Sequence, residues 1–176
     1  MPKKISEITI EKEVRRIKRD SAGKRSYEYL TYNLHYNPTV KNFSIRLFAK
    51  FFDLVFYAFI GIGIYYIKGR KLSDLYEIYA LSFILLLLLN PVLEHQFGKT
   101  LGKKFLKIQV IDDEGKYPDL RLSYKRNLLS FVNVIQLFRP IPGELGIKNN
   151  KHNEICNTYT IFDKDKPEIE NKIKES

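Results

Sequence analysis

Two long apolar stretches dominate the hydrophobic pattern of the chain, one over residues 47–67 and one over residues 75–97. As helices, each would be about 30 Å long, which matches the hydrocarbon core of a bilayer. A soluble helix shows a polar face with a period of about 3.6 residues. Residues 83–89 show no such face. The pattern therefore predicts two transmembrane helices.

The connection between these stretches, residues 68–74, is short and predicts an antiparallel helical hairpin with both ends on one side of the membrane. Lysine and arginine favour the cytoplasmic side. Three of them lie in the connection, and more lie at the opposite ends of the stretches and in the basic segment VRRIKRD. We therefore expect both termini to face the cytoplasm.

A third apolar stretch covers residues 128–142, but it is too short to span a bilayer comfortably. Asn133, Gln136, Arg139 and two prolines interrupt it. We expect an interfacial or re-entrant helix over about residues 123–142.

Two short segments between and after these helices have the alternation of β-strands. The segment KFLKIQVID predicts a strand that starts near Phe105 and ends at the turn residues DDEGK, within a cytoplasmic strand region over residues 98–122. The segment TYTIF, residues 158–162, predicts a closing strand that can pair with KIQVI.

These elements predict an all-α membrane protein. It consists of a two-span transmembrane helical hairpin with an interfacial or re-entrant third helix and a small cytoplasmic β element. Residues 1–42 form a basic cytoplasmic arm, residues 43–162 the membrane domain and residues 163–176 a charged tail.

The formal net charge of +10 points to an anionic partner. The basic groups flank the apolar stretches, which favours anionic lipid headgroups over nucleic acid. We expect the arm to be a solvated, partly disordered tail held by anionic lipid rather than a specific docking site. The expected headgroup contacts after the second span are Lys99, Lys103, Lys104 and Lys107.

Charged side chains inside the first apolar stretch are the candidate chemistry. Arg46, Lys50 and Asp53 are spaced i, i+4 and i+7, so they follow one helix face. Arg46 and Lys50 are long enough to reach the headgroups. Asp53 is shorter and lies about 10 Å above the inner end of the helix. A carboxylate at that depth is costly unless it is paired, protonated or hydrated.

Partners for Asp53 follow from the antiparallel hairpin, in which residues near the inner ends lie at matching depths. Asn90 is level with Asp53, whereas Glu94 and His95 lie lower. We predict an intramembrane polar cluster of six residues: Arg46, Lys50, Asp53, Asn90, Glu94 and His95. Such a cluster binds a cation, relays a proton, or is a buried ion pair that fixes the hairpin or an oligomer.

Motifs for enzymatic chemistry are missing from the sequence. GKTLGKK lacks the first glycine and the preceding strand of a P-loop. The three histidines are far apart, and neither a metal-ligand spacing nor a nucleophile motif occurs. Cys156 is the single cysteine, so no internal disulfide forms. We expect no enzyme activity, no metal and no cofactor.

Three blocks over residues 43–162 together resemble the RDD family of small bacterial membrane proteins. RLFAKFFD has the family's arginine at the start of the first helix, an alanine three residues later and an aspartate seven residues later. GKTLGKKFLKIQVIDDEG resembles the glycine–lysine block, strand and acidic turn that follow the second span. HNEICNTYTI resembles a closing block in which a histidine–aspartate pair precedes a strand. Here His152 is followed by Asn153, so one chargeable group is absent.

The resemblance implies a bacterial inner-membrane protein without enzyme activity or cofactor, for which transport, including cation/proton exchange, is the family's proposed role. Because two spans cannot enclose a pathway, transport would require a homo-oligomer or another membrane protein. The alternative is a non-catalytic membrane scaffold or accessory subunit, whose basic cytoplasmic face binds protein partners and anionic lipid.

Overall fold

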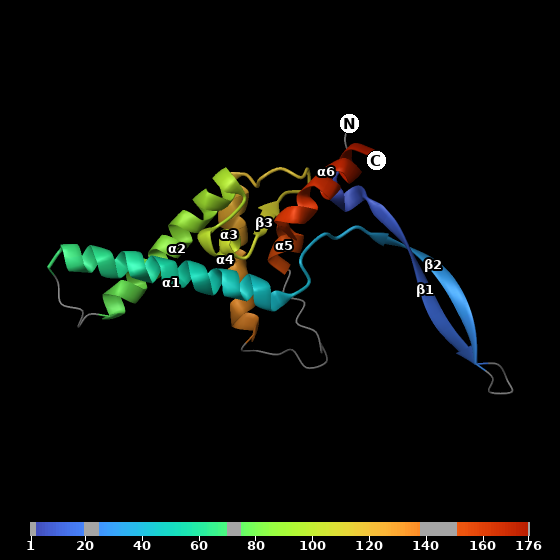
Figure 1. The fold of residues 1–176 in the computed structure, drawn as a ribbon, viewed down its shortest axis with the longest axis horizontal. Helices are drawn as coiled ribbons and strands as arrows, with labels where there is room; N and C mark the ends of the chain where they lie inside the picture. The colour runs from blue at the N-terminus through green and yellow to red at the C-terminus, as the bar shows by residue number, and fades with distance from the viewer. Residues whose placement is uncertain (1–2, 20–24, 70–74, 138–150, 176) are drawn as a thin grey trace.

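The computed structural model describes residues 3–19, 25–69, 75–137 and 151–175, and it is mostly helical with two small antiparallel sheets (Figure 1). The helices are α1 (Phe43–Ile67), α2 (Leu75–Phe97), α3 (Leu101–Phe105), α4 (Leu120–Leu137), α5 (Lys151–Cys156) and α6 (Lys166–Glu175). The strands are β1 (Thr9–Arg19), β2 (Arg25–His35), β3 (Ile108–Ile111) and β4 (Tyr159–Phe162). Short 3-10 turns cover Ile5–Glu7 and Asp163–Asp165.

Helices α1 and α2 are the two predicted spans. Both are long and apolar enough to cross a membrane, over Ser44–Ile67 and Tyr76–Phe97. Only 22% and 28% of their apolar windows are buried within the protein. The core helix of a soluble protein would hide its large apolar side chains, whereas Phe48 and Phe59 are 57% and 68% exposed. This exposure suits helices surrounded by lipid.

Helices α1 and α2 each carry a row of buried residues that repeats every four positions. The buried row of α1 is Ala49, Asp53, Tyr57, Gly61 and Tyr65, and that of α2 is Ile78, Ser82, Leu86, Asn90 and Glu94. Ridges of this period interdigitate when two helices cross at about 50°. Figure 1 shows the two helices crossing at an angle. Polar residues in both rows are therefore brought face to face.

The predicted pairing of the two short strands is confirmed. β3 and β4 are antiparallel, with Ile108 opposite Phe162 and Ile111 opposite Tyr159. The strand predicted to begin near Phe105 instead begins at Ile108, because residues 101–105 form the short helix α3. The hydroxyl oxygen of Thr100 caps this helix by accepting the Lys103 N–H at 3.4 Å.

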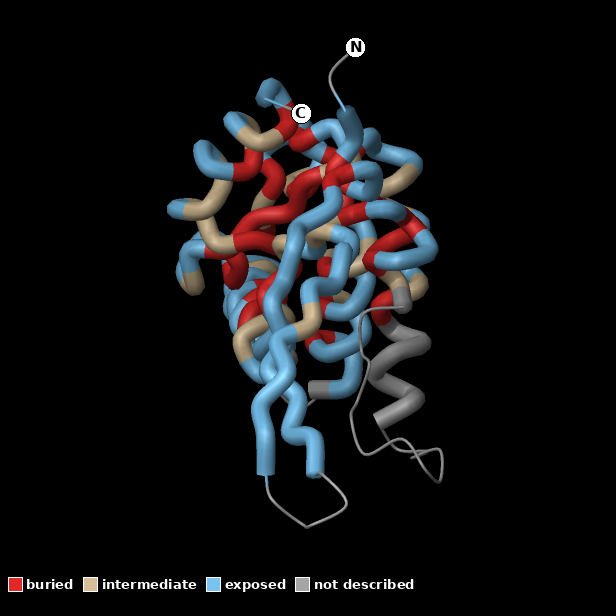
Figure 2. The backbone as a smooth tube through the Cα atoms, turned by 90° about the vertical axis from the view of Figure 1, so that its right-hand side faces the viewer, coloured by how far each residue is buried: buried red, intermediate tan, exposed pale blue. Residues whose placement is uncertain are grey.

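The basic arm differs from the expected partly disordered tail, because its residues 9–35 contain a long two-stranded ribbon. β1 and β2 pair from Thr9↔His35 to Arg19↔Arg25. The ribbon extends away from the rest of the molecule and is almost entirely exposed (Figures 1 and 2). A two-stranded ribbon alone is marginally stable in water.

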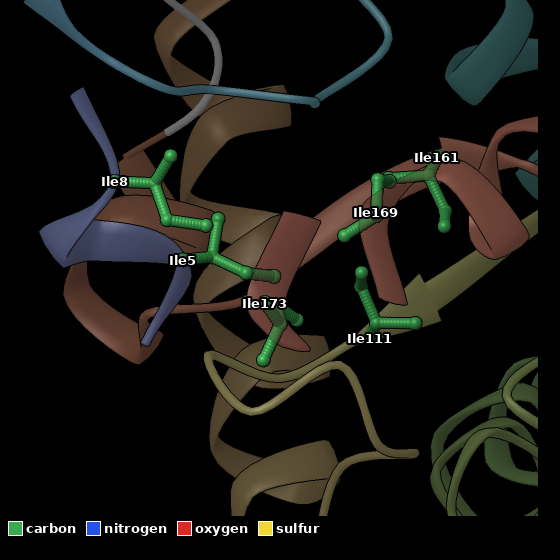
Figure 3. Close-up of a cluster of buried hydrophobic side chains, with 6 residues drawn as sticks. All are labelled: Ile5, Ile8, Ile111, Ile161, Ile169 and Ile173. Carbon is green, nitrogen blue, oxygen red and sulfur yellow. The ribbon is translucent and has the colours of Figure 1, made fainter. Parts of the chain in front are cut away.

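An N-terminal segment and the C-terminal helix α6 both fold against the β3–β4 sheet. The cluster in Figure 3 contains six buried isoleucines, drawn from the N-terminal segment, the two strands and α6: Ile5, Ile8, Ile111, Ile161, Ile169 and Ile173. Asp113 also holds the N-terminal segment in place, since its carboxylate accepts the Ser6 N–H at 2.8 Å and the Ser6 hydroxyl at 2.7 Å. The predicted charged tail is therefore an amphipathic helix with a buried side.

The predicted third helix is present as α4, which packs against α2 and α5. It starts at Leu120 and is described to Leu137. Residues 138–150, which include the rest of the predicted segment, lie outside the described residues. Its interfacial or re-entrant position stays a prediction.

A close approach of α1 and α3 makes the first prediction. A Cβ atom at Gly102 would lie 1.9 Å from the Ala49 carbonyl oxygen. We expect Gly102→Ala to lower the free energy of unfolding by at least about 1–3 kcal/mol, because the two backbones must separate. Denaturant unfolding in detergent micelles measures this loss.

Gly63→Ala is the matched control, since nothing lies within 4 Å of a Cβ atom there. Alanine is also the better helix former by about 1 kcal/mol. Equal stability of the two variants would contradict the tight α1–α3 contact.

Candidate functional site

Asp53 lies where α1, α2 and α3 meet, and it is 1% exposed. Its carboxylate accepts the Gly102 N–H at 2.7 Å and the Asn90 side-chain N–H at 3.4 Å. The Tyr57 hydroxyl donates to the side-chain oxygen Oδ1 of Asn90 at 2.7 Å. Asn90 therefore bridges two side chains of α1, as the matching depths in the hairpin predicted for Asp53.

Glu94 is the second buried carboxylate, and it is also 1% exposed. It accepts hydrogen bonds from the Lys103 ammonium, from Arg126 Nη1 at 2.7 Å and from Asn127 Nδ2 at 3.0 Å. Two cations thus share one carboxylate in a water-poor site, where the loss of any one partner is costly.

Arg126 extends the network from α2 to the C-terminal part of the chain. Besides Glu94, its guanidinium donates to Asn153 Oδ1 at 3.1 Å and to Thr160 Oγ1 at 3.0 Å. A guanidinium has a planar array of donors that suits several acceptors at once. One side chain therefore joins α2, α4, α5 and β4.

The six residues predicted to form a polar cluster do not all share one site. Asp53, Asn90 and Glu94 are buried. Lys50 of α1 donates to the Ser130 hydroxyl of α4. Arg46, also on α1, is half-buried. His95 is exposed, with its Nδ1 atom 3.1 Å from the Pro118 carbonyl oxygen.

The lysines after α2 also lie in different environments. Lys103 is 7% exposed and binds Glu94, and this burial does not fit its predicted headgroup contact. Lys103 turns inward because α3 packs its N-terminal turn against α1. The Lys99 ammonium binds the Asp163 carboxylate at 2.7 Å. For Lys104 and Lys107, the headgroup contact stays a prediction.

Arg126 and Asn127 were not predicted from the sequence. The available signal was a polar row at i, i+3, i+4 and i+7 of α4, formed by Ser123, Arg126, Asn127 and Ser130, all of which are buried. Gly102 lies in the glycine–lysine block, and no sequence pattern indicated its close packing on α1, which requires the absence of a side chain.

Cations outnumber carboxylates in this region: Arg46, Lys50, Lys103 and Arg126 accompany Asp53 and Glu94. Burial lowers the pKa of Lys103 to about 8, although Glu94 opposes this shift. Burial and then the neighbouring cations lower the pKa of His152 to about 2. His152 is therefore neutral at physiological pH.

The arrangement is suited to fastening segments together. Both buried carboxylates are occupied by donors from the protein itself. Within the described ranges, no group of three or more histidine, cysteine, aspartate or glutamate side chains is placed to hold a metal ion.

Comparison with known proteins gives one match. The RDD family model matches residues 40–156, which include α1–α5 and all of the buried network except Thr160. No curated protein and no solved structure matches the chain.

Glu94→Gln tests the network. We expect this change to lower the free energy of unfolding by about 3–5 kcal/mol, because Lys103 and Arg126 would stay buried without their counterion. Glu114→Gln is the matched control, since Glu114 pairs with Lys116 in an exposed salt bridge at 2.8 Å. Similar small losses in both variants, measured by unfolding in micelles, would contradict a stabilising network.

A pH series tests the neutral state of His152. Its folded-state pKa of about 2 lies below the ordinary value of 6.5, so the unfolded state binds the proton first. The contribution of neutral His152 to the free energy of unfolding is therefore complete above pH 6.5. It decreases below pH 6.5, by up to about 1.4 kcal/mol per pH unit.

We expect the free energy of unfolding of wild type to decrease between pH 6.5 and 5 because of His152. The His152→Gln variant should not show this decrease. His35→Gln, a change on the exposed ribbon, serves as the control and should follow wild type. Parallel curves for wild type and His152→Gln would show that His152 does not resist protonation.

Proposed function

Because the chain belongs to the RDD family and two of its helices are long and apolar enough to cross a membrane, we propose that it is a non-catalytic accessory protein of the bacterial inner membrane. Its β1–β2 ribbon binds an acidic protein partner in the cytoplasm. The charge distribution around the spans supports cytoplasmic termini.

The exposed ribbon is the observation that carries this proposal. Alternate residues of a strand share a face, and cross-strand partners lie on the same face. Ile10 pairs with Leu34 and Val14 pairs with Leu30, which gives one face two apolar pairs. Ile10, Val14 and Leu34 are 41%, 40% and 47% exposed. A partner that covers this face would stabilise a ribbon that is marginal alone.

The direction of the ribbon favours a protein over lipid. Residues 36–42 connect the end of β2 to α1, and the ribbon runs away from α1 and α2 (Figure 1). Its farther half is thus directed away from the helices that mark the bilayer. Within its described part, six cations accompany three carboxylates: Lys12, Arg15, Arg16, Lys18, Arg19 and Arg25 with Glu11, Glu13 and Glu28. An acidic surface complements this excess.

The buried network supports an anchoring role. Asp53 and Glu94 accept hydrogen bonds from Gly102, Arg126 and other groups, which join the spans to the rest of the chain. Transport is the competing hypothesis. It would require Asp53 to exchange its bonds from Gly102 and Asn90 for a proton or a cation.

Photo-crosslinking in bacterial cells tests the ribbon. A photoreactive residue at position 14, on the apolar face, should crosslink to a protein. The same residue at position 13, on the opposite face, should do so far less. With the identified partner purified, Val14→Glu should weaken binding by about tenfold or more, as for a buried interface residue, without changing the melting temperature.

Crosslinks to lipid alone, or equal yields from both positions, would contradict a protein-binding face. A second measurement addresses transport directly, through cation-driven proton flux in liposomes with wild type beside Asp53→Asn. We expect no flux from wild type. Flux that Asp53→Asn abolishes at an unchanged melting temperature would replace the anchoring proposal with transport.

A further inference from the structure

A cavity of about 310 Å³ lies where the base of the ribbon meets α5 and β4. On one side it is lined by the segment that follows β2, including Tyr36 and Asn37. On the other side it is lined by Asn153, Thr158 and Tyr159. This volume is at the lower end of the range of ligand pockets, about 300–1,000 Å³.

Two residues that line this cavity each carry a buried polar atom with no hydrogen-bond partner among the described residues. The two atoms are Asn153 Nδ2 and Thr158 Oγ1. Asn153 is 4% exposed and Thr158 is 1% exposed. Buried polar groups are nearly always hydrogen-bonded, because leaving one unpaired is costly. A ligand that reaches these two atoms from the cavity would satisfy both.

The Arg126 contact determines which end of the Asn153 amide is left for the ligand. Arg126 Nε is a donor, and it binds Asn153 Oδ1 at 3.1 Å. The NH₂ group is thus the end without a partner, and it can only donate. A donor recognises an acceptor and repels a metal cation. The guanidinium behind the amide strengthens this donor by polarising it.

The charge around the cavity also favours a negatively charged ligand. The buried region behind Asn153 holds four cationic side chains and two carboxylates. Glu154 also lines the cavity, but its side chain is exposed, so solvent and salt screen its charge. The balance favours an anion over a neutral molecule or a cation.

We propose that this cavity binds a small oxyanion, a carboxylate or phosphate group, through Asn153 Nδ2 and the Thr158 hydroxyl. Tyr36 and Tyr159 supply the aromatic part of the wall. The oxyanion is either a free small molecule or the phosphate of a lipid headgroup, since both offer the same acceptors. The site is separate from the apolar face of the ribbon and does not depend on a protein partner.

Binding is measured with the full-length protein in nanodiscs of neutral phosphatidylcholine, titrated with inorganic phosphate and with acetate at constant ionic strength. We expect saturable binding of at least one anion by calorimetry. Thr158→Val keeps the shape and removes the hydroxyl, so it should weaken binding by about tenfold or more. Asn153→Asp keeps the acceptor for Arg126 and places a negative charge at the cavity, so it should abolish binding.

Ser123→Ala is the matched control. Ser123 Oγ is also buried without a partner among the described residues, but it does not line the cavity. This variant should bind like wild type. Circular dichroism and melting temperature establish that each variant is folded, and either of the two cavity variants alone tests the proposal.

A second series uses nanodiscs that contain phosphatidylglycerol. If this lipid raises the melting temperature of wild type but not of Thr158→Val or Asn153→Asp, and phosphate and acetate do not bind, the oxyanion is a lipid headgroup. Saturable binding in neutral nanodiscs assigns a free anion. Absence of both effects, or effects that the two cavity variants retain, would overturn the proposed site.

Discussion

The contact between the Glu94 carboxylate and the Arg126 guanidinium connects the membrane helices to the rest of the chain. Glu94 belongs to α2, and Arg126 reaches onward to Asn153 of α5 and Thr160 of β4. Both side chains are at least 95% buried. In such a site the desolvation of each charge is compensated only by its partners. The arrangement of α2, α4 and the β3–β4 sheet therefore depends on both residues being present.

Asp53 has a comparable role at the other side of the hairpin. An aspartate inside an apolar stretch is costly when its oxygens lack donors. Here Gly102 supplies a backbone N–H, and this approach is possible because a glycine allows α3 to touch the backbone of Ala49. The buried carboxylate of Asp53 thus requires the Gly102 N–H, and the glycine allows that N–H to come close enough. Asp53 ties the segment after α2 back onto α1.

The sequence predicted the elements that obey local rules. The spans follow from the length of apolar stretch that a bilayer requires, and the β3–β4 pair follows from alternation. The proximity of Asp53 and Asn90 follows from equal depth in a hairpin. Arg126 and Thr160 could not be placed, because their meeting depends on how distant segments pack. The ribbon was missed because β1 carries charges on both faces, and α6 because its charged composition concealed Ile169 and Ile173.

The base of the ribbon and the proposed oxyanion site meet at one place in the fold. Asn153 receives a hydrogen bond from Arg126 and lines the cavity, and the opposite wall is formed by the residues that end the ribbon. An oxyanion bound there would complete a series of contacts from Glu94 in the membrane hairpin to the base of the ribbon. Its binding would hold that base against α5 and so restrict the directions in which the ribbon points. A partner bound to the ribbon would in turn favour the same position, since coupling between two sites is reciprocal.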